Sequence, residues 1–140
     1  MGADELAKAA GEAMWRADRT SRWLDMQLEE IRAGYTRMSM TVTGDMTNGQ
    51  AMCHGGLIFT LADSSFGFAC NSRNQRAVAA GCAIEFLAPA LLGDRLTAEC
   101  SEQAVAGRSA VYDARVTNQK GELIALFRGK SATVKGSWVE

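Results

Sequence analysis

Apolar and polar residues alternate along much of the chain after Met26, the period-two pattern of half-buried β-strands. The clearest example is 37–43, where Met38, Met40 and Val42 alternate with arginine, serine and threonine. A predicted turn at Ala33-Gly34 separates this segment from an earlier strand that starts at Met26, and Pro89, the only proline, ends a later one. Together these signals predict strands beginning at Met26 and over 37–43, 78–87, 96–101, 108–117 and 122–134, with a hairpin turn at 118–121.

Three segments favour helices instead of strands. Residues 3–14 are alanine-rich with two acids near the start, and a short helix is expected over 20–24. The stretch 56–71 is apolar nearly all round, as in a helix enclosed by the rest of the protein. Its exceptions recur every three or four residues and form one polar, small-residue stripe: Thr60, Asp63, Ser64 and Gly67.

One long buried helix combined with a run of antiparallel strands predicts an α+β fold. The length of 140 residues suits a single domain, here 1–140, with a short helical N-terminal segment at about 1–24. There are no repeats, linkers or low-complexity tracts that would divide it.

Composition and charge narrow the choice of partners. Apolar residues make up 47% of the chain and charged residues 22%, the mixture of a soluble globular protein. The formal net charge is −1 and no block of lysine and arginine stands out, which argues against nucleic acid or an anionic membrane as a partner. The N-terminus lacks the apolar core of a signal peptide, and no apolar run could cross a bilayer. A cytoplasmic location is expected.

The four cysteines show no metal or redox spacing. Cys53, Cys70, Cys82 and Cys100 form no C-x-x-C pair, and a single histidine cannot complete a metal site. We expect four reduced thiols packed as small hydrophobes, and neither a metal ion nor a redox cofactor. A nucleophilic Cys53–His54 pair is disfavoured because adjacent side chains point apart and no third group orients them. The motifs G-x-S-x-G, G-x-G-x-x-G and the P-loop are absent as well.

His54-Gly55-Gly56 falls where the long helix begins. The first N–H groups of a helix lack intrahelical partners, and the positive helix end favours developing negative charge. The Gly55 N–H could therefore serve as an oxyanion hole. The spacing fits equally a glycine-rich turn that only lets the chain swing into the helix.

Asp63 lies within the apolar helix, where burying a carboxylate is costly without compensation. It could activate a water or attack an acyl carbon, with the Gly55 N–H stabilising the oxyanion. Alternatively it is hydrogen-bonded to neighbouring hydroxyls at a packed interface. Gly55 and Asp63 are separated by roughly 12 Å along a helix axis, so one helix can hardly supply both groups to one carbonyl. Two antiparallel helices related by a two-fold axis could supply both groups. This predicts a symmetric dimer whose interface covers the polar stripe.

Three segments carry a resemblance to a known family: MTVTGDMTNGQAMCHGGLIFTLADSSFGFACNS, VAAGCAIEFLAPALLGDRL and ALFRGKS. Over residues 20–134 the chain resembles the hotdog-fold acyl-CoA thioesterases, most of all those of the PaaI type, which act in phenylacetate degradation. The resemblance implies a long helix wrapped by a curved antiparallel sheet. It also implies homodimers with a continuous sheet, active sites at the dimer interface, and homotetramers as the usual assembly.

The same resemblance implies a role for each matching residue. Asp63, from the opposite subunit, would be the general base or nucleophile, and the Gly55 N–H would polarise the thioester carbonyl. His54 and Asn48 would position that carbonyl or the attacking water, and Ser64 would form a hydrogen bond nearby. Some relatives place a serine opposite the carboxylate, but the aligned segment 79–81 is Ala-Ala-Gly and offers no hydroxyl.

The implied reaction is hydrolysis of an aryl-acyl-CoA, such as phenylacetyl-CoA or its ring-hydroxylated forms, to free acid and coenzyme A. Coenzyme A is then part of the substrate, and no separate cofactor is needed. The cations that could meet its phosphates are Arg73, Arg76, Arg108, Arg128 and Lys130; each could equally be a solvated surface charge. Apolar residues that could line an acyl pocket are Phe59, Phe66 and Phe68. Two alternatives are an acyl-CoA-binding hotdog protein without activity and a hotdog dehydratase.

Overall fold

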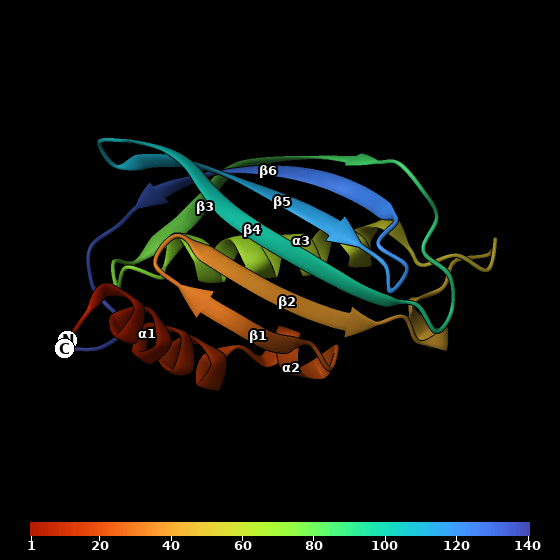
Figure 1. Cartoon of the computed structure of the whole chain (residues 1–140), viewed down its shortest axis with the longest axis horizontal. Helices are drawn as coiled ribbons and strands as arrows, with labels where there is room; N and C mark the ends of the chain where they lie inside the picture. Colours follow the sequence, from red (N-terminus) through yellow and green to blue (C-terminus); the bar gives the residue numbers. More distant parts are fainter.

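A six-stranded antiparallel sheet forms the body of the structure, a computed structural model that describes all of residues 1–140 (Figure 1). The strands lie in the order β1-β2-β4-β5-β6-β3. Their bounds are β1 (Gln27–Arg32), β2 (Tyr35–Thr41), β3 (Ala77–Phe86), β4 (Arg95–Ala106), β5 (Ser109–Thr117) and β6 (Leu123–Thr133). The strand β3 is therefore one free edge of the sheet.

The helix α3 (Gly55–Cys70) packs across one face of this sheet and contacts every strand. Side chains at alternate strand positions, such as Leu96, Ala98 and Cys100 of β4, are buried beneath it. Gly129 of β6 lets the helix approach closely, because a Cβ there would lie 2.8 Å from the ring of Phe66. This arrangement is the enclosed helix that the apolar pattern predicts.

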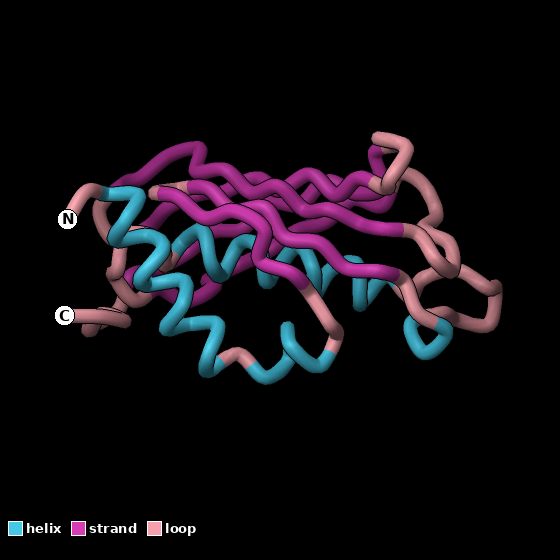
Figure 2. The backbone as a smooth tube through the Cα atoms, turned by 60° about the horizontal axis from the view of Figure 1, so that its bottom comes forward, coloured by secondary structure: helices cyan, strands magenta, loops and turns pink.

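Two further helices, α1 (Ala3–Ala17) and α2 (Arg19–Trp23), lie on the same side of the sheet as α3 (Figure 2). α1 packs against β1, and Gly11 permits the contact, since a Cβ there would lie 3.0 Å from Cδ1 of Ile31. Asp18 caps α2 by accepting a hydrogen bond from the backbone N–H of Ser21. A short 3₁₀ turn, η1 (Gly44–Met46), precedes the loop that leads into α3.

The predicted elements are confirmed in kind and order, with differences at their ends. α1 continues three residues beyond 14, and β4 continues from Ser101 to Ala106. The added part of β4 follows a bulge between Glu102 and Ala104, which interrupts the alternation that defined the shorter strand. None of the helices combines the length and the apolarity needed to cross a lipid bilayer.

Candidate active site

Asp63 is a half-buried carboxylate on α3 that has no hydrogen-bond or ion-pair partner within the chain. The nearby hydroxyls are engaged elsewhere: Thr60 donates to the carbonyl of Gly56 at 2.8 Å, and Ser64 contacts Ser21. Burial raises the pKa of Asp63 because the charged form loses hydration. Within the chain, no neighbouring hydroxyl holds this carboxylate.

Asp63 lines a groove of about 310 Å³ between α3 and the N-terminal helices. The polar stripe of α3 forms one side of the groove, and α1, α2 and the residue joining them form the other. The residues that line it are Met14, Asp18, Thr20, Thr60, Asp63, Ser64, Gly67 and Phe68. A carboxylate without a protein partner thus faces a space large enough to hold part of a small ligand.

The start of α3 leaves one backbone donor unused. The amides of Leu57 and Ile58 donate to the carbonyl of His54 at 2.9 and 3.3 Å, and the amide of Gly56 donates to His54 Nδ1 at 2.9 Å. The Gly55 amide has no acceptor in the chain, at the positive end of a 16-residue helix. This donor has the properties that an oxyanion hole requires.

The capping bond also orients the exposed imidazole of His54. Because Nδ1 accepts from Gly56, the neutral ring carries its proton on Nε2, which faces away from the cap. His54 therefore presents an N–H donor at the start of α3. It is not free to act as a base through Nδ1.

Hydrogen bonds of Asn48 stabilise the loop that precedes α3. Its Oδ1 accepts from the amides of Gln50 and Met52 at 2.9 and 3.3 Å, and its own amide donates to the Met52 carbonyl at 2.7 Å. The side-chain NH₂ has no acceptor in the chain, so two donors remain available. The amide of His54 donates to the Met46 carbonyl at 2.7 Å, which ties the end of this loop to η1.

Ser64 is linked to the N-terminal segment by a hydrogen bond. Its Oγ lies 3.2 Å from Oγ of Ser21, whose hydroxyl proton is directed to Asp18 Oδ2 at 2.7 Å. Ser64 is therefore the donor in the serine pair, and its lone pairs stay free. At Ser64 the stripe thus contacts α2 of the same chain.

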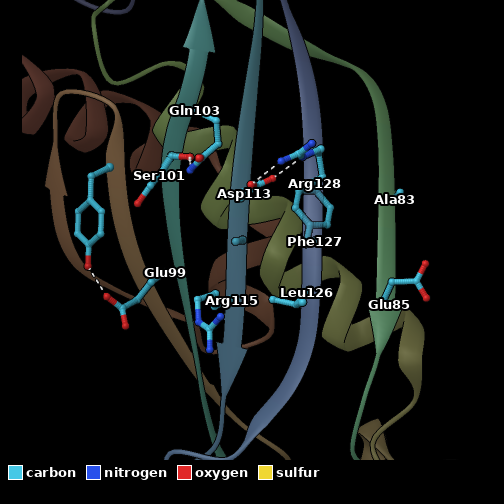
Figure 3. Close-up of a pocket in the computed structure, with 12 residues that line it drawn as sticks. Ala83, Glu85, Glu99, Ser101, Gln103, Asp113, Arg115, Leu126, Phe127 and Arg128 are labelled. Carbon is cyan, nitrogen blue, oxygen red and sulfur yellow. Dashed lines mark hydrogen bonds and ion pairs between the residues drawn. The ribbon is translucent and has the colours of Figure 1, made fainter.

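Most of the basic residues proposed for coenzyme A are already engaged. Arg128 forms a bidentate pair with Asp113 at 2.6 and 2.8 Å (Figure 3), and Arg73 pairs with Glu102 at 2.9 Å. Arg76 donates to the carbonyl of Ser137 and stacks on Trp138, 3.9 Å from the ring centroid. The groove of about 580 Å³ in which Arg128 lies is on the sheet face turned away from α3 (Figure 3).

Arg108 and Lys130 are exposed and form no ion pair. They come from neighbouring segments of the sheet, since the amide of Thr133 in β6 donates to the carbonyl of Arg108. Of the five cations, these two are the ones whose charge is not already compensated by a carboxylate or held against a tryptophan.

The three phenylalanines of α3 all pack in or against the core. Phe59 and Phe66 pack on Phe127, with ring centroids 5.5 and 5.7 Å apart. Phe68 is 1% exposed and also borders the groove beside Asp63. Sequence reasoning missed Phe86, whose ring would lie 3.1 Å from a Cβ at Gly55, because nothing in the sequence brings the end of β3 to the start of α3.

The four cysteines are free thiols, as expected. Cys53 is buried, its Sγ–H faces the carbonyl of His54 at 3.6 Å, and burial raises its pKa, so it is a poor nucleophile. Cys82 differs from the expectation of packed thiols, because it is exposed on the edge strand β3.

Comparison with known proteins places this geometry in a family. Residues 50–125 match the family model of the thioesterase superfamily. The chain belongs to this superfamily. It is 41% identical to the acyl-coenzyme A thioesterase PaaI of Escherichia coli over 125 residues, which cover 89% of each chain.

Solved structures agree with the sequence comparison. The E. coli PaaI protein from the phenylacetic acid degradation operon superposes with a TM-score of 0.95 at 38% identity, covering 97% of this chain and 99% of that one. A Streptococcus mutans protein bound to acetyl-CoA superposes with a TM-score of 0.77 at 25% identity, covering 80% and 90%. The PaaI resemblance, the hotdog fold and the assignment as a thioester hydrolase are thereby confirmed.

Proposed function

We propose that this thioesterase hydrolyses aryl-acyl-CoA esters, such as phenylacetyl-CoA or its ring-hydroxylated forms, to the free acid and coenzyme A. One observation carries the proposal: a half-buried, unpartnered carboxylate and an unused helix N-terminal amide lie on the same helix. Similarity to E. coli PaaI and to a relative bound to acetyl-CoA supports the substrate class.

The reaction needs two copies of the chain. Asp63 and the Gly55 amide lie roughly 12 Å apart along one helix, whereas both must approach within roughly 3 Å of one carbonyl group. A two-fold axis would bring Asp63 of one subunit to the Gly55 amide of the other.

The strand β3 suits this pairing. It is a sheet edge whose residues are largely exposed, including the apolar Val78 at 52% and Phe86 at 50%. A second β3 would satisfy its free backbone groups and cover this apolar surface, and such dimers would then pair into tetramers.

In the proposed hydrolysis, the Gly55 N–H donates to the thioester carbonyl oxygen as negative charge develops on it. Ionised Asp63 takes a proton from water while the water oxygen bonds to the carbonyl carbon. The tetrahedral intermediate collapses, the carbon–sulfur bond breaks, and the thiolate of coenzyme A takes the proton that Asp63 holds, which returns Asp63 to its ionised form. A thiol with a pKa near 8.5 leaves readily, so no strong general acid is needed.

Asp63 could instead attack the carbonyl carbon and form a mixed anhydride that water then hydrolyses. A single turnover in ¹⁸O-labelled water separates the two routes. A general base sends the label only into the product acid, whereas water attacking the aspartyl carbon of the anhydride leaves the label in Asp63.

The remaining assignments belong to the same proposal. His54 Nε2–H and the Asn48 NH₂ position the substrate carbonyl or the water. Ser64 accepts a hydrogen bond nearby. Arg108 and Lys130 bind the phosphates of coenzyme A. No cofactor takes part. A cytoplasmic location is supported by the four free cysteines.

The proposal is tested by measuring thiol release from phenylacetyl-CoA and from straight-chain acyl-CoA esters. Asp63→Asn keeps the size of the side chain but removes its basicity, and should lower kcat at least about 100-fold, the range for a positioned acid or base. Asp45→Asn, at an exposed carboxylate, is the matched control and should leave kcat unchanged. Binding of these esters by the wild type without thiol release would mean an acyl-CoA carrier instead. Conversion of hydroxyacyl-CoA to an enoyl ester would mean a dehydratase.

A further inference from the structure

The N-terminal helices form one wall of the groove that contains Asp63. Met14 of α1 and Thr20 of α2 line it opposite Gly67 and Phe68 of α3. Neither helix belongs to the sheet-and-helix body described above, yet both contribute side chains within the same small space as the proposed catalytic carboxylate.

Specific contacts hold this wall against α3. Ser21 is fully buried and bonds to Ser64, the residue next to Asp63, while its hydroxyl proton goes to Asp18. One turn further along α3, Trp15 packs on Phe68 with ring centroids 6.1 Å apart. A buried polar link and an aromatic contact, 43 and 53 positions apart in sequence, fix the distance across the groove.

The groove has a polar part at Asp63 and an apolar part beyond it. Met14 is its half-buried apolar side chain, Phe68 borders it from the core at 1% exposure, and Gly67 adds open space, since a Cβ there would meet nothing within 4 Å. A thioester with its carbonyl carbon beside Asp63 must place its acyl group within a few ångströms. The apolar part of the groove is the surface that such a group can contact.

We propose that α1 and α2 complete the acyl-binding pocket and that Met14 determines which acyl groups it accepts. This inference rests on the proposed function, because it takes the carbonyl carbon to lie beside Asp63. The groove volume of about 310 Å³ is near the lower limit of roughly 300 Å³ for small-ligand pockets, so the length of Met14 limits the size of the acyl group. Methionine is flexible enough to adjust to an aromatic ring, while still excluding larger groups.

A comparison of substrates with acyl groups of increasing size tests the proposal. We would measure kcat/KM for acetyl-CoA, phenylacetyl-CoA and naphthylacetyl-CoA with the intact dimer. Met14→Ala should raise the naphthylacetyl/phenylacetyl ratio of kcat/KM at least about tenfold, the scale on which a pocket discriminates groups differing in apolar size. Glu12→Ala, at an exposed position of the same helix, is the control and should leave the ratio unchanged.

Met14→Ala could change kcat/KM only because it loosens the packing of α1. A second variant separates this effect from a change in the acyl pocket. Thr20 is exposed at the rim of the groove, so Thr20→Phe adds bulk without opening a cavity. It should lower kcat/KM for both aryl esters about tenfold more than for acetyl-CoA. Far-UV circular dichroism would establish that both variants are folded.

The outcomes separate this inference from the function on which it rests. If the wild type releases thiol but both folded variants change kcat/KM for all three esters equally, or not at all, the N-terminal helices are structural only and the inference is wrong. If the wild type releases no thiol from any ester, the proposed function fails and the inference fails with it.

Discussion

Gly55 has no side chain, so its proposed role in the reaction depends on its backbone N–H alone. It is the first residue of α3 and its amide has no acceptor, while the three amides that follow are all bonded to His54. Proline is tolerated at the first position of a helix, where its missing N–H costs no helical hydrogen bond. The preceding residue, His54, has φ −58° and ψ 131°, a conformation compatible with a following proline.

We predict that Gly55→Pro lowers kcat by about 10²–10³-fold, the usual effect of removing one oxyanion donor, while leaving α3 formed. Gly55→Ala is the matched control, since it introduces the same Cβ beside Phe86 at 3.1 Å but keeps the N–H. The half-exposed ring of Phe86 can move by the few tenths of an ångström required. Steady-state thiol release with both variants is the measurement. Equal losses in the two variants would show that crowding by the side chain, and not the missing donor, causes the effect.

Asp63 should reduce the stability of the fold at neutral pH. Its pKa is raised by burial, so the folded state holds the proton more tightly than the unfolded state, where the value is about 3.9. The free energy of unfolding then falls as pH rises from the unfolded pKa through the folded one. We predict that Asp63→Asn is more stable than the wild type at pH 7 and that this advantage shrinks as pH falls toward about 4.

Urea unfolding of the two proteins at fixed concentration across this pH range tests the prediction, with Asp45→Asn as the control for loss of an exposed carboxylate. A wild type more stable than Asp63→Asn at pH 7 would contradict it. That result would mean that a donor in the assembled protein stabilises the ionised carboxylate.

At the scale of elements, α3 was fully predictable because one sequence segment contains its own signals. The apolar residues on nearly all sides and the His-Gly-Gly start predict the helix and its burial, which the structure confirms, and the polar stripe predicts the face that we propose to be functional. The end of β4 was not predictable, because the bulge at 102–104 shifts the period by one residue.

The second wall of the groove could not be derived from sequence for a different reason. Residues 3–14 predict a helix by composition, but nothing in them specifies that Met14 will face Phe68 or that Ser21 will bond to Ser64. The same holds for the basic residues: Arg128 is neutralised by Asp113, its cross-strand neighbour, through a register that only the folded sheet defines. Sequence gives the type of side chain, whereas its partner depends on tertiary packing.

At the scale of the whole molecule, the proposed mechanism requires more than one chain. The carboxylate and the unused amide are at different positions along α3, and the edge strand β3 is exposed and apolar. Both features are explained together if two chains join through β3 and exchange these groups. Each active site then consists of Asp63 from one subunit and Gly55 from the other.

Mixed dimers of two inactive variants test this exchange directly. In a dimer of an Asp63→Asn chain with a Gly55→Pro chain, one site has both defects, while the other combines intact Asp63 from the second chain with intact Gly55 from the first. We predict that co-expressed, doubly tagged heterodimers recover about half of the wild-type kcat per dimer, since one of two sites is whole. The two homodimers, each with a defect in both sites, are the controls and should stay at least about 100-fold below wild type. If each chain carried a complete site, every site of the heterodimer would have one defect and no activity would return.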